Sequence, residues 1–365
     1  MAEVPVIVRR VSLRDFRSYG SLELALEPGV VLITGPNGAG KTNLLEALHV
    51  GSQGFSPRTR AEGRLIRFGA PAARVALSGD ENGSPVETQV DVRGSKGKEV
   101  RVNGAVLTGI DELRLRLSAL AFTPDRLAVV KGGPIVRRSY FDRMLGRLFP
   151  ARAALPGDFG RALAQRNAAL RRVRAGESSL DAVEPWTQQV AELGGELDRR
   201  RSELVGLLAP GFRAKAGLLG LEDAELDYEE RGLTPDELNV RLEADVERGT
   251  TGVGPHLRDV RVSSGSRDLR GYGSQGEQRS AVLALVVAEG ALVAEKRSAP
   301  PLLLLDDVFS ELDESRRLAL VTSLPAGSQT LVTMTDRSAY PIGGPDPGLV
   351  VSVRREEEAS LAEAA

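Results

Sequence analysis

Residues 35–42 read Gly35-Pro36-Asn37-Gly38-Ala39-Gly40-Lys41-Thr42 and match in full the pattern G-x-x-x-x-G-K-[ST] of a phosphate-binding loop. The flanks agree, because residues 30–33 (VVLI) are typical of a strand buried on both faces and residues 42–49 of a helix. The glycines allow backbone turns that a Cβ would forbid, so that amides converge on phosphate oxygens. We expect Lys41 to reach the β- and γ-phosphates and the Thr42 hydroxyl to bind Mg²⁺. The stretch therefore predicts an ATP site in an α/β lobe.

A second motif lies far along the chain, where an apolar run ends in two acids. Residues 302–305 (LLLL) predict another buried strand, and Asp306 and Asp307 follow at its carboxyl end. Beside the phosphate loop, Asp306 would help to hold Mg²⁺, and Asp307 would be the catalytic carboxylate that orients and polarises the attacking water. The alternative is an aspartate pair that caps the next helix.

A third motif, Ser274-Gln275-Gly276-Glu277, precedes a long apolar helix expected over residues 278–295. Alone it predicts no more than a helix start, because Ser is a good N-cap and Gly permits close backbone approach. Its position 32 residues before Asp306 leaves room for one helix and a return to the sheet. The order of phosphate loop, Ser-x-Gly turn, acidic strand and D-loop (Ser310-Glu311-Leu312-Asp313) resembles that of ABC-type ATPases. In those proteins the Ser-x-Gly turn caps the γ-phosphate of ATP bound to a second subunit.

The composition of the 365 residues excludes several other kinds of site. The sequence has no cysteine, which rules out disulfide frameworks, thiolate zinc sites and cysteine nucleophiles, and it has only two histidines. The net charge is −2, so any surface for nucleic acid must be a local patch. The first ten residues carry no export signal, and the longest apolar stretch, residues 281–288, is far shorter than the ~20 residues of a membrane span. We therefore expect a cytoplasmic protein with no membrane partner.

The order of strand and helix signals predicts one α/β lobe made from both ends of the chain. Strand-like segments dominate residues 1–110, beginning with residues 4–16, and return in residues 250–365, whereas helical periodicity dominates residues 111–249. This middle part is broken at prolines such as Pro210 and has no heptad run long enough for a long coiled coil. We therefore expect a mainly helical inserted domain, and a frayed acidic tail from Arg354.

One stretch of the inserted domain has a basic face. On a helical wheel, four arginines of residues 161–174 share one arc, and apolar side chains occupy the other, with Arg166 among them. Such a face could bind DNA phosphates without regard to sequence. The alternative is a solvated face whose charges are paired with neighbouring acids. The four arginines are Arg161, Arg171, Arg172 and Arg174.

These motifs and several others together resemble the RecF family, which is related to SMC heads. The resemblance covers residues 4–340 and rests on LRDFRSY at 13–19, GPNGAGKTNLLEA at 35–47 with Asn43 after the loop threonine, FTPDRLAVVKGGPIVRRSYFD at 122–142, GPH at 254–256, GSQGEQRS at 273–280 and LLLDDVFSELD at 303–313. Residues 122–142 are the most distinctive, because general ABC-type ATPases lack them. The chain departs from the family at Leu257, where an arginine is usual, and no glutamine loop stands out, although Gln53 follows the first helix.

The resemblance implies a weak, switch-like ATPase that uses ATP and Mg²⁺ and forms an ATP-dependent homodimer on double-stranded and gapped DNA. It implies RecO and RecR as partners in loading RecA at junctions of single- and double-stranded DNA, and so a part in recombinational repair, replication restart and the SOS response. The protein would be cytoplasmic, and associated with the nucleoid when bound to DNA.

Two other ATPase classes share the nucleotide motifs. The ATPase subunit of a membrane transporter would carry Leu-Ser-Gly-Gly-Gln where this chain has residues 273–277, and a histidine after Met334, where it has Thr335 and Asp336. An SMC-type head that bridges DNA would need hundreds of heptad residues between its motifs, and only about 230 residues separate Gly40 from Ser274.

Overall fold

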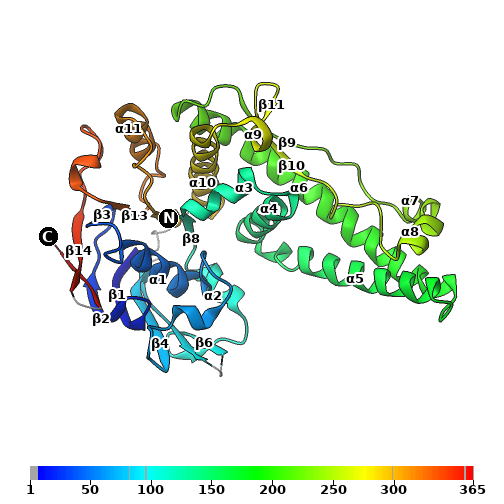
Figure 1. The fold of residues 1–365 in the computed structure, drawn as a ribbon, viewed down its shortest axis with the longest axis horizontal. Helices are drawn as coiled ribbons and strands as arrows, with labels where there is room; N and C mark the ends of the chain where they lie inside the picture. The colour runs from blue at the N-terminus through cyan, green and yellow to red at the C-terminus, as the bar shows by residue number, and fades with distance from the viewer. Residues whose placement is uncertain (1–6, 82, 95–96, 298, 357–358, 365) are drawn as a thin grey trace. The chain divides into compact units, whose positions relative to one another are not determined.

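The computed structural model describes residues 7–81, 83–94, 97–297, 299–356 and 359–364, so residues 4–6 of the first predicted strand lie outside the described residues (Figure 1). The chain divides into two compact units. The first consists of Met1–Leu127, Ala214–Leu221 and Gln275–Ala365, and the second of Ala128–Arg213 and Glu222–Ser274. Both chain ends thus contribute to the first unit, whose borders lie near 127 and 275, where the sequence analysis placed them near 110 and 250.

Six strands of the first unit form a mainly parallel sheet around β3 (Val30–Thr34), the strand that precedes the phosphate loop. In order across the sheet they are β15 (Ala359–Ala364), β14 (Leu349–Glu356), β3, β13 (Thr330–Met334), β12 (Leu302–Leu305) and β8 (Ala119–Phe122). All run parallel except β15, which returns antiparallel to β14. Because β3 and β12 point the same way, their carboxyl ends meet at one edge, where the phosphate loop and the acidic pair both begin.

This sheet corrects two predictions. Residues 119–122 lie in the stretch predicted to be helical, but they form β8, which pairs with β12 along its whole length. A run of four apolar residues has no periodicity that separates a strand from a buried helix, so only the partner strand decides. The tail from Arg354 was expected to fray; instead residues 354–356 and 359–364 belong to the β14–β15 hairpin, in which Val353 and Ala362 are buried.

A second, antiparallel sheet of the first unit has the strand order β2-β1-β4-β5-β6-β7. These strands are β1 (Ile7–Phe16), β2 (Tyr19–Ala25), β4 (Ala72–Glu81), β5 (Ser84–Arg93), β6 (Gly97–Val102) and β7 (Ala105–Val106). Side chains alternate along its strands: those on one face, such as Val11 and Leu13 of β1, are buried in the core, and those on the other face are turned toward water. Helix α1 (Lys41–Gln53) lies between the two sheets and contacts strands of both, and Figure 1 shows it beside β1.

The first unit also carries helices that close its core. They are α2 (Ile110–Arg116), the 3₁₀ turns η1 (Glu62–Leu65), η3 (Pro124–Leu127) and η6 (Arg337–Ala339), α10 (Gln275–Arg297) and α11 (Glu314–Thr322). Most of α10 is buried, including the whole run from Gln278 to Gly290. The long apolar helix predicted over residues 278–295 is thereby confirmed, with one more turn at its start.

The second unit is mainly helical. Its helices are α3 (Ala128–Lys131), α4 (Pro134–Leu148), η4 (Pro150–Arg152), α5 (Leu155–Arg174), η5 (Leu180–Ala182), α6 (Glu184–Leu218, whose last turn counts with the first unit), α7 (Pro235–Val240), α8 (Leu242–Arg248) and α9 (Leu269–Tyr272). A small sheet has the order β11 (Arg267–Asp268), β10 (Val260–Ser264), β9 (Ala224–Tyr228). The break predicted at Pro210 is wrong, because α6 continues through it. At 35 residues α6 is the longest described helix, far short of a long coiled coil.

Candidate nucleotide site

The phosphate loop joins β3 to α1 and takes a backbone shape that its glycines make possible. Gly35, Gly38 and Gly40 have φ angles of 147°, 81° and 116°, which L side chains rarely adopt. A Cβ on Gly35 would lie 2.1 Å from the carbonyl oxygen of Val353 in β14, and a Cβ on Gly40 would lie 2.4 Å from the Oγ of Ser360 in β15. Of the other loop residues, Pro36 and Asn37 are exposed and Ala39 is buried. The final hairpin therefore packs so closely on the loop that only glycine fits at positions 35 and 40.

The ammonium group of Lys41 lies within the curve of this loop. Its Nζ donates hydrogen bonds to the carbonyl oxygens of Gly35 (2.6 Å) and Pro36 (2.9 Å). Burial lowers the pKa of Lys41, and the carboxylates of Asp307 and Asp306 act in the opposite direction. The loop lysine and the two carboxylates therefore lie close enough together to interact electrostatically.

The loop threonine and the first aspartate are in direct contact. The Thr42 Oγ1 donates a hydrogen bond of 3.0 Å to Oδ1 of Asp306, and the Thr333 Oγ1 donates one of 2.7 Å to the same oxygen. Asp306 is buried, and this burial raises its pKa against the effect of the two hydroxyls. A hydroxyl and a carboxylate side by side are hard oxygen donors of the kind that Mg²⁺ prefers. Among the described residues no group of three or more His, Cys, Asp or Glu could hold a metal by itself.

Asp307 differs from Asp306 in exposure and in backbone shape. Its side chain is exposed, and its φ angle of 51° lies in the left-handed region, which costs a non-glycine residue about 1 kcal/mol or more. Two contacts hold this conformation: the backbone N–H donates to the Oγ1 of Thr333 (2.8 Å), and Arg279 of α10 donates to the backbone carbonyl. A carboxylate held on a fixed backbone and open to solvent can orient a water molecule.

Arg279 also connects α10 to the residues that follow Asp307. Its guanidinium donates to the Oγ of Ser310 (3.3 Å), forms an ion pair with Glu311 (3.2 Å) and lies 5.6 Å from the ring centre of Phe122. The sequence analysis missed Arg279 and Thr333, although Arg279 lies inside the quoted stretch GSQGEQRS. Because the start of α10, residues 275–280 (QGEQRS), is polar, an arginine there gives no signal in the sequence, and only the fold reveals its contacts.

A buried carboxylate on α1 forms a second polar cluster beside the loop. Arg17 donates two hydrogen bonds to Glu46 (2.8 and 2.7 Å), Arg58 donates a third (3.1 Å) and the Ser56 hydroxyl a fourth (2.6 Å). The Glu46 side chain has no exposed area, so a charge there must be paired. The sequence analysis did not name this cluster; an acid within the apolar run of a helix was its signal.

Two further polar residues of α1 have structural partners. Asn43 donates to the Oγ of Ser18 (2.8 Å) and accepts from Arg58 (3.2 Å). Gln53 is buried and donates to backbone carbonyl oxygens, one of them that of Leu117. Asn43 thus links the loop to the cluster around Glu46, whereas the Gln53 amide group is used to fix the end of α1.

The Ser-x-Gly motif lies at the exposed start of α10. Ser274, Gln275 and Gly276 are exposed, Glu277 is half-buried, and a Cβ on Gly276 would meet no atom within 4 Å. The N-terminal turn of a 23-residue helix, open to solvent, suits an anion that comes from another molecule. Its action on the nucleotide of a second subunit stays a prediction.

The D-loop residues mostly serve local structure. The Ser310 hydroxyl donates to the carbonyl oxygen of Asp307 (3.2 Å), and Leu312 is buried. Asp313 caps α11 by accepting from the backbone N–H of Arg316 (2.9 Å), and this hydrogen bond lowers the pKa of Asp313. The residue that caps the next helix is therefore Asp313 and not the pair at the end of β12.

The basic face predicted on α5 is present. All four arginines, Arg161, Arg171, Arg172 and Arg174, are exposed. Arg161 pairs with Asp158, while Arg171 and Arg174 make only long hydrogen bonds, of 3.4 and 3.5 Å, to backbone carbonyl oxygens near α8. Arg166 points the other way and is fully buried against Asp245 (2.9 Å). Contact of this face with DNA stays a prediction.

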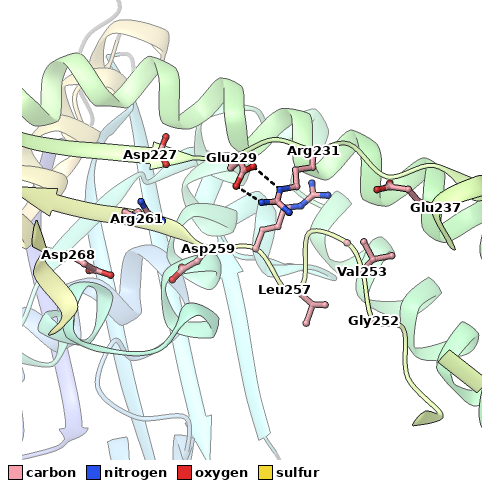
Figure 2. A pocket seen from close by; sticks show the side chains of 12 residues that line it. Asp227, Glu229, Arg231, Glu237, Gly252, Val253, Leu257, Asp259, Arg261 and Asp268 are labelled. Carbon is pink, nitrogen blue, oxygen red and sulfur yellow. Dashed lines mark hydrogen bonds and ion pairs between the residues drawn. The ribbon is translucent and has the colours of Figure 1, made fainter. Parts of the chain in front are cut away.

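A cavity of about 510 Å³ in the second unit contains none of the predicted site residues. Figure 2 shows two of its lining side chains, Glu229 and Arg231, joined by a pair of hydrogen bonds of 2.9 and 2.7 Å. Asp259, which also lines it, is bonded to Arg137. The charges of Glu229, Arg231 and Asp259 are therefore already paired within the protein.

Comparison with known proteins gives one consistent result. The family model of the RecF/RecN/SMC N-terminal domain matches residues 7–341. The chain is 35% identical to a DNA replication and repair protein RecF of Heliobacterium modesticaldum, over 91% of this chain and 93% of the relative. It is 34% identical to the protein of the same name from Pseudarthrobacter chlorophenolicus, over 89% and 92%.

Solved structures agree with these sequences. A recombination mediator protein RecF of the RecFOR pathway, solved with ATP, has a TM-score of 0.85 and 25% identity, with 100% of this chain and 99% of that chain covered. An Smc head domain from Pyrococcus furiosus, bound to the C-terminal domain of ScpA, has a TM-score of 0.61 and 17% identity, with 99% and 96% covered. The second similarity shows the fold alone. None of the described helices has the length and apolar character that crossing a bilayer requires.

Proposed function

The chain belongs to the RecF family of DNA replication and repair proteins, and from that premise we propose that it is an ATP-dependent DNA-binding protein of recombinational repair. Its ATPase lobe is of the ABC type, as the strand order and the SMC-head-like fold show. The observation that carries the proposal is the hydrogen bond between Thr42 and Asp306, which joins the two halves of a nucleotide site from the two ends of the chain. This membership leaves no role for the transporter alternative, and the SMC-type bridging head is supported only as a fold.

We assign the following parts in the ATP site. Lys41 and the backbone amides of the loop bind the β- and γ-phosphates, because the Lys41 ammonium already lies against the loop at the carbonyl oxygens of Gly35 and Pro36. Thr42 and Asp306 would hold Mg²⁺, which neutralises phosphate charge when it is bound. Asp307 orients the attacking water, and Thr333 and Arg279 keep its backbone in place.

Hydrolysis is weak and works as a switch in this proposal. The exposed Ser274-Gln275-Gly276 turn completes the site of a second copy, so ATP joins two heads as a homodimer and hydrolysis releases them. Turnover then waits for dimerisation, which DNA promotes by holding two copies together. The exposed start of α10 supports this step.

The dimer acts on double-stranded and gapped DNA, and the exposed arginines of α5 hold phosphates without reading sequence. We propose RecR and RecO as its partners, with RecA loaded as the result at junctions of single- and double-stranded DNA. This work supports replication restart and the SOS response, and it places the protein in the cytoplasm, on the nucleoid when bound to DNA.

The test is sedimentation velocity of the full-length protein with and without Mg-ATP and DNA, together with measured ATP affinity. The wild type should bind ATP and dimerise with it, and Lys41→Ala should lose both properties. The control is Lys215→Ala, which removes a lysine of the same unit that bonds to the carbonyl oxygen of Ser323. Unchanged ATP affinity in the Lys41 variant would show that the site is misplaced.

A further inference from the structure

One aromatic side chain of the first unit is fully exposed to solvent. Phe68, in the connection between η1 and β4, has a relative exposure of 102%, so no neighbour covers its ring. Single exposed aliphatic residues are common on proteins, but a phenylalanine ring that gives up all burial also gives up the main favourable contribution it makes to folding. The ring therefore has no structural task in the folded chain.

The connection that carries Phe68 is firmly attached to the end of β1. The backbone N–H of Arg17 donates to the carbonyl oxygen of Leu65 (2.8 Å), and that of Arg67 donates to the carbonyl oxygen of Asp15 (2.8 Å). The guanidinium of Arg67 lies against the start of β2, where a Cβ on Gly20 would lie 2.4 Å from it. The exposed ring thus projects from a connection whose backbone is fixed to the end of β1, a strand of the antiparallel sheet that is blue in Figure 1.

The connection that carries Phe68, and the strand β1 to which it is hydrogen-bonded, hold arginines without an ion-pair partner among the described residues. On β1, exposed Arg10 and Arg14 alternate with buried Val11 and Leu13. We call the basic ridge the set Arg10, Arg14, Arg60, Arg64 and Arg67, none of which forms an ion pair with a described acid. Other arginines of the same sheet do: Arg74 and Arg101 both bind Asp91. The carboxylates of the same segments are Asp15 of β1, Glu23 of β2 and Glu62 of η1, and Glu62 is paired with Lys98, so the five arginines remain in excess.

We propose that the basic ridge and Phe68 form a nucleic-acid site that binds DNA where a base is unpaired. The arginines hold backbone phosphates, and the ring of Phe68 stacks on the face of the free base. Phosphates alone would need only the arginines, whereas an aromatic ring gains from a base face that a closed duplex keeps within its own stack. One ring buries too little area to anchor a protein to a lipid bilayer, so an anionic membrane fits less well.

This site rests on the proposed function and deepens it. The face of α5 would hold duplex phosphates, and the basic ridge would recognise the single-stranded side of a gap or junction. The protein would thereby tell damaged or stalled DNA from closed duplex by a contact in its ATPase unit.

The experiment compares two DNAs of equal length in Mg-ATP: a relaxed, covalently closed circular duplex in which every base is paired, and the same circle with one single-stranded gap that carries 2-aminopurine. Phe68→Ala should lose at least about fivefold in affinity for the gapped DNA and quench 2-aminopurine less, with the closed duplex unaffected. Phe68→Trp should restore both. The matched control is Ile342→Ala, because Ile342 is 85% exposed in the same unit. The double variant Arg64→Ala/Arg67→Ala should lower the salt slope by up to about two.

The outcomes separate this site from the proposed function. If the wild type binds neither DNA, both fail together. If the wild type binds DNA but Phe68→Ala binds the two DNAs as the wild type does, or loses no more than Ile342→Ala, the basic ridge is not a site and the proposed function stands. Phe68-dependent binding to phosphatidylserine vesicles in place of gapped DNA would also overturn the inference.

Discussion

The Thr333 hydroxyl connects both aspartates of the nucleotide site, which makes Thr333→Val a sharp test of that geometry. Thr333 donates to the Asp306 carboxylate at 2.7 Å and accepts from the Asp307 backbone N–H at 2.8 Å, and it is 1% exposed. Valine has nearly the same shape and neither hydrogen bond. A hydrogen bond to a charged group contributes about 1.5–3 kcal/mol, and a buried N–H left unpaired costs about 1–3 kcal/mol. Because both losses occur at one side chain, they are not additive, and we expect the free energy of unfolding to fall by about 3 kcal/mol in total.

The control for this variant is Thr330→Val in the same strand. Thr330 is also buried, and its hydroxyl makes one long hydrogen bond, 3.3 Å, with Ser328. We expect Thr330→Val to cost only about 0.5–1.5 kcal/mol. Urea unfolding at constant pH measures both.

The same variant should change how ATP binding depends on Mg²⁺ and pH. Burial already raises the pKa of Asp306, and loss of the Thr333 donor raises it further, so a larger fraction is protonated at low pH. Mg-dependent ATP affinity of Thr333→Val should therefore fall further below that of the wild type as the pH is lowered, and approach it as the pH is raised. If Thr333→Val and Thr330→Val prove alike in stability and in Mg²⁺ dependence, the assigned network around Asp306 is refuted.

Four further predictions follow from the described contacts. Asp307→Asn should keep ATP affinity but slow hydrolysis and prolong the ATP-bound dimer; hydrolysis at the wild-type rate would remove Asp307 from the catalytic role. Ser274→Arg should bind ATP yet fail to dimerise, and an ATP-dependent dimer in sedimentation velocity would contradict capping in trans. Replacement of Arg161, Arg171, Arg172 and Arg174 by alanine should lower the salt slope of duplex binding by up to about four while ATP affinity stays the same, and an unchanged slope would make the α5 face merely solvated. Burial lowers the pKa of His256 below the ordinary value of about 6.5, so as the pH falls the unfolded chain takes up a proton on this histidine before the folded chain does. The free energy of unfolding is therefore unaffected by His256 above that pH and falls below it. His256→Gln removes this effect and should lose less stability than the wild type between pH 7.5 and pH 5.

The parts of the site that were predicted from sequence are those that local geometry dictates. Gly35, Gly40, Lys41 and Thr42 stand in one short loop whose shape tolerates few residue types, so the pattern alone indicates the chemistry. Asp306 was predictable because an apolar strand that ends in acids has a fixed place in such a sheet. The structure brings the phosphate loop and this acid together, because Thr42 donates a hydrogen bond to Asp306.

The parts that were missed depend on partners distant in the chain. Thr333 and Arg279 become important only when β13 and α10 bring them to the end of β12, and nothing in their neighbouring residues announces this. The strand at residues 119–122 is defined by its pairing with β12, about 180 residues later. Pro210 shows the opposite error, because a residue that usually ends a helix is tolerated within α6.

The contact between the final hairpin and the phosphate loop has a consequence for the order in which this protein is made. The ribosome completes residues 35–42 early, but β14 and β15, which press on Gly35 and Gly40, are translated more than 300 residues later. β13, the neighbour of β3 on its other side, is also made late, at residues 330–334, shortly before β14. A nascent chain halted before residue 349 would carry an intact G-x-x-x-x-G-K-T motif on a sheet that has not closed around it, and should not retain ATP. Nucleotide binding thus reports that synthesis has reached the last strands, and a truncated message would yield a chain unable to form the ATP-bound state.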